Sequence, residues 1–268
     1  MKFLRWITAR LSARSGEAES PVNWYGLLQE AHAHLRLEEY DKARAVLLQV
    51  LLSRDSINDP ETISYILMSL GSTWLLTDQY DEEIAFFSEY LDRFPEDSAA
   101  YRGRAEAFWY MGRLQDAVRD YSHALELKPS DILAFSGRGQ VLAEAGEHGR
   151  AIEDLDLALR ALKTASMPDA SWKEWYEQIE AFVHNGRAFA LAGLGESGPA
   201  MDEFEVSIRM SPENAWVYHN RGQVYERAGN RENARADYQT ALTKKNPALS
   251  PNRKAHAQAR VRELSNRP

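Results

Sequence analysis

The sequence contains no cysteine among its 268 residues. It therefore has no disulfide, no thiolate metal ligand and no cysteine nucleophile, which is compatible with a reducing compartment. No apolar run approaches the roughly 20 residues that a membrane-spanning helix needs, and the N-terminus lacks the apolar stretch of a secretory signal. Ten prolines and fifteen glycines are too few for a disordered or collagen-like chain. We therefore expect a folded, cytoplasmic protein.

Positive charge is scarce outside the N-terminus. The net charge is −8, but the first fourteen residues carry four basic side chains and no acid, so the remaining chain carries −12. Such an acidic body repels phosphates, and we expect no nucleic-acid partner. Residues 1–20 are interpreted as a basic N-terminal segment. Residues 1–14 fit three interpretations: an amphipathic helix that contacts an anionic membrane, a flexible tail, or a helix that packs on the body.

Four glycines indicate an internal period. Gly112 and Gly146 are 34 residues apart, and so are Gly195 and Gly229. Periods of this length are typical of repeat proteins whose units stack on one another. Extending the period in both directions gives six units, at residues 24–57, 64–97, 98–131, 132–165, 181–214 and 215–248.

Small residues recur at fixed positions of these units. Position 8 is alanine or glycine in all six, and position 20 is alanine in all but the second, which has Glu83. Two helices approach closely only where small side chains face each other. The glycine at position 15 suits the left-handed residue that ends a first helix, and proline at position 32 of three units stops the second. Each unit is therefore predicted to be two helices joined by a tight turn.

This pattern resembles the tetratricopeptide repeat (TPR) family over most of the chain. The resemblance implies an all-α fold, a right-handed α-solenoid of about six helix-turn-helix units within residues 21–265. Residues 251–264 follow the last unit, have one apolar and one charged side, and are predicted to form a C-terminal capping helix. The second unit departs from the pattern at Glu83 and Tyr90, where small residues are expected.

An arginine at position 7 and an acid at position 23 occur together in the last four units and are both missing from the first two. The pairs are Arg104 with Asp120, Arg138 with Asp154, Arg187 with Glu203, and Arg221 with Asp237. The planar guanidinium suits a bidentate carboxylate, so we expect an ion pair between the two helices of each unit. The alternative is that these arginines bind the carboxylates of a ligand.

In proteins that resemble this one, the first helices line a concave face that accepts an extended or helical peptide. Aromatic side chains mixed with hydrogen-bonding ones dominate binding hot spots, and both kinds occur at the positions expected to point there. The predicted partner-binding residues are Arg102, Glu106, Trp109, Tyr110, Gln140, Asn185, Phe189, Trp216, His219, Asn220, Gln223 and Arg227. Each aromatic residue among them could instead pack between neighbouring helices.

Residues 166–180 interrupt the repeats. Pro168 and Asp169 indicate a helix start, so the first helix of the fifth unit is predicted to be two to three turns longer than the others. A secondary aromatic stripe, Trp172, Trp175 and Tyr176, follows helical spacing on this extension. Exposed aromatic patches mark interaction sites, but the stripe could also fold back onto the fourth unit.

The sequence has no pattern that indicates catalysis. Its seven histidines lack a metal-ligand spacing, and it has no phosphate-binding glycine loop or nucleophile elbow. We therefore predict no enzyme, no cofactor and no metal. The predicted function is a non-catalytic scaffold or adaptor that binds a peptide or protein segment in the concave groove. The alternatives are a self-assembling structural homo-oligomer and a regulatory subunit at a membrane surface.

Overall fold

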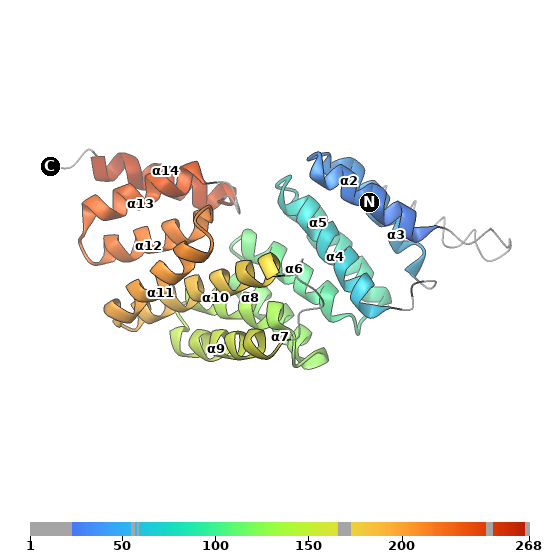
Figure 1. The fold of residues 1–268 in the computed structure, drawn as a ribbon, viewed down its shortest axis with the longest axis horizontal. Coiled ribbons are helices and arrows are strands. Elements are labelled where there is room, and N and C mark those ends of the chain that lie inside the picture. The colour runs from blue at the N-terminus through green and yellow to red at the C-terminus, as the bar shows by residue number, and fades with distance from the viewer. Residues whose placement is uncertain (1–22, 55–56, 58, 166–172, 245–248, 266–268) are drawn as a thin grey trace. The chain divides into compact units, whose positions relative to one another are not determined.

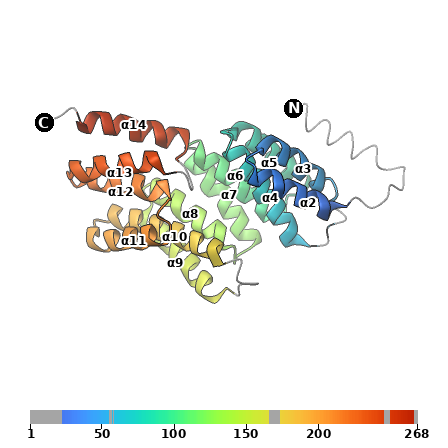
Figure 2. The same ribbon diagram turned by 45° about the horizontal axis from the view of Figure 1, so that its top comes forward.

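The computed structural model describes residues 23–54, 57, 59–165, 173–244 and 249–265. These residues form thirteen α-helices and no strand, so the predicted all-α fold is confirmed. The chain divides into two compact units, Met1–Ala107 and Phe108–Pro268. Figures 1 and 2 show the helices of both units.

Unit 1 contains the consecutive helices α2 (Trp24–Arg36), α3 (Tyr40–Leu51), α4 (Pro60–Leu75) and α5 (Tyr80–Arg93), followed by most of α6 (Ser98–Tyr110). The helices from α2 to α5 pack side by side (Figure 1). The helix α4 begins four residues before the predicted repeat start at 64. Asp59 explains the early start, because its carboxylate caps the backbone N–H groups of Glu61 and Thr62, and Pro60 occupies the first helical position.

Unit 2 continues the helix pairs and ends in a single helix. Its helices are α7 (Leu114–Leu127), α8 (Ile132–Glu144), α9 (His148–Thr164), α10 (Lys173–Gly193), α11 (Ser197–Met210), α12 (Ala215–Arg227), α13 (Arg231–Thr243) and α14 (Pro251–Ser265). The first helices α8, α10 and α12 contact one another in sequence, and α14 packs on α13. At 21 residues, α10 is longer than its counterparts α8 and α12 with 13 each, as predicted.

The turn inside each helix pair requires a left-handed residue. Gly112, Gly146, Gly195 and Gly229 have φ between 75° and 86° at this point. The first two pairs instead have Glu38 (φ 58°) and Asp78 (φ 57°), so an ordinary side chain is held in a conformation that favours glycine.

Replacing Glu38 with glycine is expected to stabilise the chain. The side chain of Glu38 is exposed and its backbone is left-handed, so the change removes strain but adds freedom to the unfolded chain. The net gain is about 0.5–1 kcal/mol, measurable as a higher midpoint of thermal unfolding. The reverse change, Gly112→Ala, should lower it. A Glu38→Gly protein that melts earlier than the original would show that this turn is unstrained.

The small positions of the repeat are buried contacts between helices. Ala117, Ala151, Ala200 and Ala234, all at position 20, are 0% exposed. A Cβ added to Gly139 would lie 2.6 Å from Cγ of Leu155, which shows how closely α8 and α9 approach. Glu83 holds the same position in unit 1 and is also 0% exposed.

Arginine–acid pairs join the two helices of the last three repeats. Nε and Nη2 of Arg138 donate to the two oxygens of Asp154 at 2.7 and 2.8 Å. Arg221 and Asp237 form the same two-bond pair at 2.8 Å for both bonds. Three of the four predicted pairs are therefore confirmed, since Arg187 also binds Glu203. The fourth predicted pair stays a prediction, because Arg104 lies in unit 1 and Asp120 lies in unit 2.

Candidate functional site

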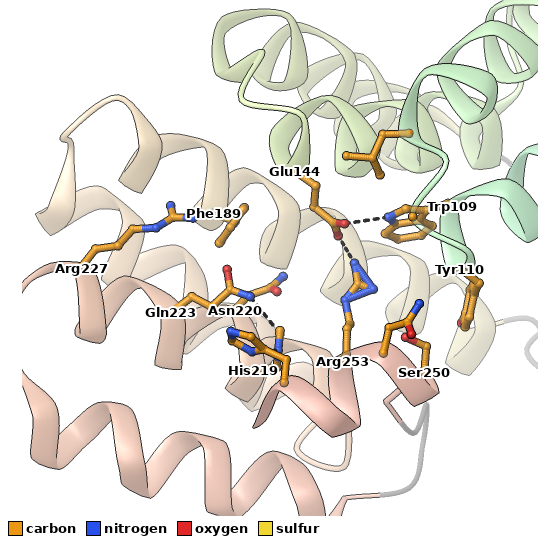
Figure 3. A pocket seen from close by; sticks show the side chains of 14 residues that line it. Trp109, Tyr110, Glu144, Phe189, His219, Asn220, Gln223, Arg227, Ser250 and Arg253 are labelled. Atoms are coloured by element: carbon orange, nitrogen blue, oxygen red, sulfur yellow. Dashed lines mark hydrogen bonds and ion pairs between the residues drawn. The ribbon is translucent and has the colours of Figure 1, made fainter. Parts of the chain in front are cut away.

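A pocket of about 340 Å³ lies in unit 2, where the end of α6 and the first helices α8, α10 and α12 meet the start of α14 (Figure 3). We call it the inner pocket. Three of its lining residues are the last residues of their helices, namely Tyr110, Glu144 and Arg227. The turn glycines Gly112, Gly146 and Gly229 follow them two residues later. The lining residues are Trp109, Tyr110, Gly112, Leu114, Glu144, Phe189, His219, Asn220, Gln223, Arg227, Ser250, Asn252, Arg253 and His256.

Aromatic rings from α6 and α12 meet at one end of the inner pocket. The ring centroids of Trp109 and Trp216 are 4.8 Å apart, with the planes at 66°. Tyr110 lies 5.4 Å from Trp216 on the same side. Such tilted contacts are favourable for aromatic pairs. Trp109 and Trp216 are only 4% and 2% exposed, so they form a fixed aromatic wall in which Trp109 lines the pocket and Trp216 does not.

The side chain of Arg253 extends from α14 to this aromatic wall. The central guanidinium carbon lies 3.9 Å from the ring centroid of Trp216 and 5.3 Å from that of Trp109. Nη2 of Arg253 donates to Oε1 of Glu144, while Nε1 of Trp109 donates to Oε2 of the same carboxylate at 3.0 Å (Figure 3). The side chains of Arg253 and Glu144 are 14% and 20% exposed, so this ion pair is largely shielded from water.

A histidine pair closes another side of the inner pocket. Nε2 of His219 lies 3.1 Å from Nδ1 of His256, and Nδ1 of His219 lies 3.4 Å from the amide nitrogen of Gln223. If the amide donates to Nδ1, then Nε2 of His219 is the donor to His256, and both rings are neutral. Burial lowers the pKa of His219 to about 3, and the charge of Arg253 adds to the effect.

Acidification is expected to destabilise unit 2 through His219. In the unfolded chain the ring binds a proton near pH 6.5, whereas in the folded chain it does so only near pH 3. Stability therefore falls as the pH drops below about 6.5. The loss at pH 5 is about 2 kcal/mol.

This effect is measured by urea unfolding at pH 7 and pH 5. The His219→Gln variant is expected to lose less stability than the original chain between these two pH values. The comparison isolates His219 from His256 and His148, whose pKa values are also lowered by burial. An equal loss in both proteins would mean that His219 is accessible to protons in the folded state.

Comparison with known proteins now identifies the repeats. Sequence profiles described as tetratricopeptide repeat match residues 28–98, 102–166 and 217–243, more than half of the chain. The chain belongs to the tetratricopeptide repeat family. The predicted family and the predicted architecture of helix-turn-helix units are thereby confirmed.

Solved TPR structures share this fold at low sequence identity. The crystal structure of the APC/C hetero-tetramer Cut9–Hcn1 matches with a TM-score of 0.65 and 16% identity, and the match covers 98% of this chain and 46% of that one. A tetratricopeptide repeat protein from Parabacteroides merdae matches with a TM-score of 0.52 and 17% identity, covering 91% of this chain and 99% of its own. At these identities the likeness shows the fold alone.

Two curated human proteins match part of the TPR region. Tetratricopeptide repeat protein 6 is 27% identical over 168 residues, which is 62% of this chain and 29% of that protein. Protein O-mannosyl-transferase TMTC1 is 22% identical over 177 residues, 66% of this chain and 19% of that protein. The chain therefore spans less than a third of either relative, and the transferase activity in the second name belongs to that protein.

The TPR structure brings together seven of the predicted partner-binding residues. The inner pocket is lined by Trp109, Tyr110, Phe189, His219, Asn220, Gln223 and Arg227. Arg227 is exposed and lies over the ring of Phe189, with 5.0 Å between its guanidinium carbon and the ring centroid. These two side chains belong to neighbouring first helices, as the repeat pattern predicted.

Three other predicted residues are buried between TPR helices and do not line the inner pocket. Gln140 is 2% exposed and donates to the carbonyl oxygen of Phe182 at 2.5 Å. Asn185 is 0% exposed and accepts from the amide of Asn220 at 3.2 Å. Trp216 packs against Trp109, which does line the pocket. In this structure Gln140 and Asn185 join adjacent repeats.

The last two predicted residues, Arg102 and Glu106, lie in unit 1. Nη2 of Arg102 is 3.4 Å from the hydroxyl of Ser64 on α4. Burial raises the pKa of Glu106, and the nearby charge of Arg102 opposes this shift. Both side chains thus interact within their own unit.

The aromatic stripe is partly packed on the TPR core. Trp172 lies outside the described residues. Trp175 is partly buried against the apolar cluster of unit 2 that also contacts Leu162, and Ile179 is 8% exposed. Trp175 and Tyr176 contact each other edge to face, with centroids 5.1 Å apart. The described part of the stripe is therefore at least partly packed on the apolar core of unit 2, and its role as an interaction site stays a prediction.

Arg253 and His256 were not among the predicted site residues. They lie on α14, which follows the last 34-residue unit, so the repeat pattern gave no direction for their side chains. Among the described residues there is no group of three histidine or acidic side chains that could hold a metal ion. Likewise, the helices of the described ranges include none long and apolar enough to cross a membrane.

Proposed function

We propose that this chain is a scaffold that binds a peptide or protein segment in the inner pocket. TPR domains generally mediate protein–protein binding. The observation that carries the proposal is the convergence of seven predicted binding residues on this one pocket. They come from α6, α10 and α12, which are separated in the sequence and meet only in the folded repeat array.

The chemistry of the inner pocket suits a protein ligand. Its volume of about 340 Å³ lies at the lower end of the range of ligand pockets and is enough for one or two side chains of a protein segment. Aromatic rings of Trp109, Tyr110 and Phe189 provide apolar contact area, while Asn220 and Gln223 offer hydrogen bonds that fix orientation. This combination is typical of hot spots in protein interfaces.

Peptides selected from a random display library on the full chain are expected to bind through the inner pocket. The double variant Gln223→Ala/Arg227→Ala should raise their dissociation constants about tenfold or more, since it removes two polar side chains that line the pocket. Both side chains are at least partly exposed, so the fold should survive. Calorimetric titration of each selected peptide provides the measurement.

The matched control is Glu205→Ala/Arg209→Ala. These residues form an exposed pair on α11, with side chains 65% and 68% exposed, and they are not in the inner pocket. The control should leave every dissociation constant unchanged. If the selected peptides bind the pocket variant as tightly as the original chain, the proposal is wrong and the binding surface lies elsewhere.

A further inference from the structure

The inner pocket contains a small site that already holds a guanidinium group. The guanidinium of Arg253 lies against the rings of Trp109 and Trp216 and donates to the carboxylate of Glu144. We call Trp109, Trp216 and Glu144 the arginine slot. They come from α6, α12 and α8, whereas the group that they hold comes from α14.

The arginine slot has the features that distinguish arginine from other side chains. A flat, delocalised cation stacks on aromatic rings, and Trp216 offers its face at 3.9 Å. Glu144 supplies the opposite charge and is held in place by the indole N–H of Trp109 at 3.0 Å. Lysine would bring charge without the planar group, and an uncharged side chain would leave the shielded carboxylate of Glu144 without its cation.

The helix that fills the arginine slot is attached to its own repeat by few apolar contacts. Ala257 is the only buried residue described for α14, and Val261 and Leu264 add partly buried contacts with α13. The polar contacts of α14 are ion pairs from Arg253 to Glu144 and from Arg260 to Glu226, together with the contact of His256 with His219. Segments with little buried apolar surface open locally at lower free energy than the rest of a fold.

From these contacts we propose that the arginine slot is the recognition site for an arginine of a partner segment, and that Arg253 occupies it in the free protein. This deepens and rests on the proposed function, because it names the side chain that the inner pocket selects. Arg253 then acts as an internal competitor. A partner binds by displacing it from Trp109, Trp216 and Glu144, while the remainder of α14 keeps its contacts with α13.

The test uses three tripeptides that share a blocked glycine–X–glycine backbone, in which X is arginine, lysine or citrulline. Citrulline has the shape of arginine without its charge. Binding to the full chain is followed by the indole N–H resonance of Trp109 in NMR spectra. In the Arg253→Ala variant, the arginine peptide should shift this resonance saturably and bind about tenfold or more tighter than the citrulline and lysine peptides.

Competition by Arg253 gives the second expected result. The original chain should bind the arginine peptide about tenfold or more weakly than Arg253→Ala does. Arg260→Ala, which removes the other α14 ion pair, should behave like the original chain. Adding Glu144→Gln to Arg253→Ala should abolish the preference for arginine. Release of α14 in a variant does not disturb the test, because the arginine slot is built from α6, α8 and α12.

Either of two results would overturn the inference: no saturable shift in Arg253→Ala, or equal binding of the arginine and citrulline peptides. The proposed function fails differently. Suppose that the display-selected peptides need Gln223 and Arg227 for binding but contain no required arginine. The arginine slot would then be rejected as a recognition site, whereas the inner pocket would remain the binding site.

Discussion

Replacing Arg138 with methionine is expected to lower the stability of unit 2 by about 3 kcal/mol or more. The guanidinium of Arg138 makes two bonds to Asp154, and the carboxylate side chain is only 7% exposed. Without its partner, the buried carboxylate of Asp154 has no opposite charge beside it. Urea unfolding followed by circular dichroism measures the loss, and hydrogen exchange of α8 and α9 localises it.

Two further variants separate this structural role from a general effect of charge. Arg138→Met/Asp154→Leu removes both charges and should recover most of the stability, because apolar pairs replace buried ion pairs at little net cost. Arg119→Met removes an exposed arginine, 65% accessible, from its pair with Asp116 and should cost less than about 1 kcal/mol. Equal losses for Arg138→Met and Arg119→Met would contradict a structural pair.

Replacing Glu83 with methionine is expected to stabilise unit 1 by about 3 kcal/mol at pH 7. The Glu83 side chain is 0% exposed, and neither of its oxygens has a hydrogen-bond partner in the structure. It occupies the position that is alanine in the other five repeats. Methionine fills a similar volume without a polar group. Thermal and urea unfolding provide the measurement.

The pH dependence of this gain has a definite sign. Burial raises the pKa of Glu83 well above its ordinary value, with the charge of Glu106 adding to the shift and that of Arg44 opposing it. The folded chain therefore keeps the proton that the unfolded chain releases above about pH 4.5. The original chain loses stability as the pH rises through the folded pKa, so the advantage of Glu83→Met should grow from pH 4 to pH 8.

Glu82→Met is the matched control, because Glu82 is adjacent and exposed. It should change stability by less than about 0.5 kcal/mol. If Glu83→Met destabilises unit 1, then the carboxylate has a role in holding α4 and α5 together. That result would contradict the interpretation of Glu83 as a buried carboxylate that lowers the stability of unit 1.

The helices and their turns were predictable from the sequence because the constraints that set them are local. Gly112, Gly146, Gly195 and Gly229 mark turns that only a left-handed residue can make, and their spacing gave the period. The pairing of Arg138 with Asp154 was also predictable. The two residue types appear and disappear together across the repeats, so they report a contact within one repeating unit.

The residues that line the inner pocket were only partly predictable, because their exposure depends on how closely the first helices of different repeats pack. The contact between Trp109 and Trp216 joins residues from α6 and α12 and buries a side chain that the pattern assigned to an open groove. Arg253 lies outside the period, so no repeated position indicated its direction. Such contacts arise from packing across several repeats rather than from any one of them.

A crosslinking experiment tests the proposed binding site most directly. A display-selected peptide carrying a photoreactive benzophenone is bound to the full chain, irradiated, and the attachment points are found by mass spectrometry. Our account predicts crosslinks to residues of the inner pocket, chiefly Tyr110, Gln223 and Arg227, and their loss when unlabelled peptide is added in excess. Competed crosslinks confined to the second helices, such as α9 or α11, would contradict it.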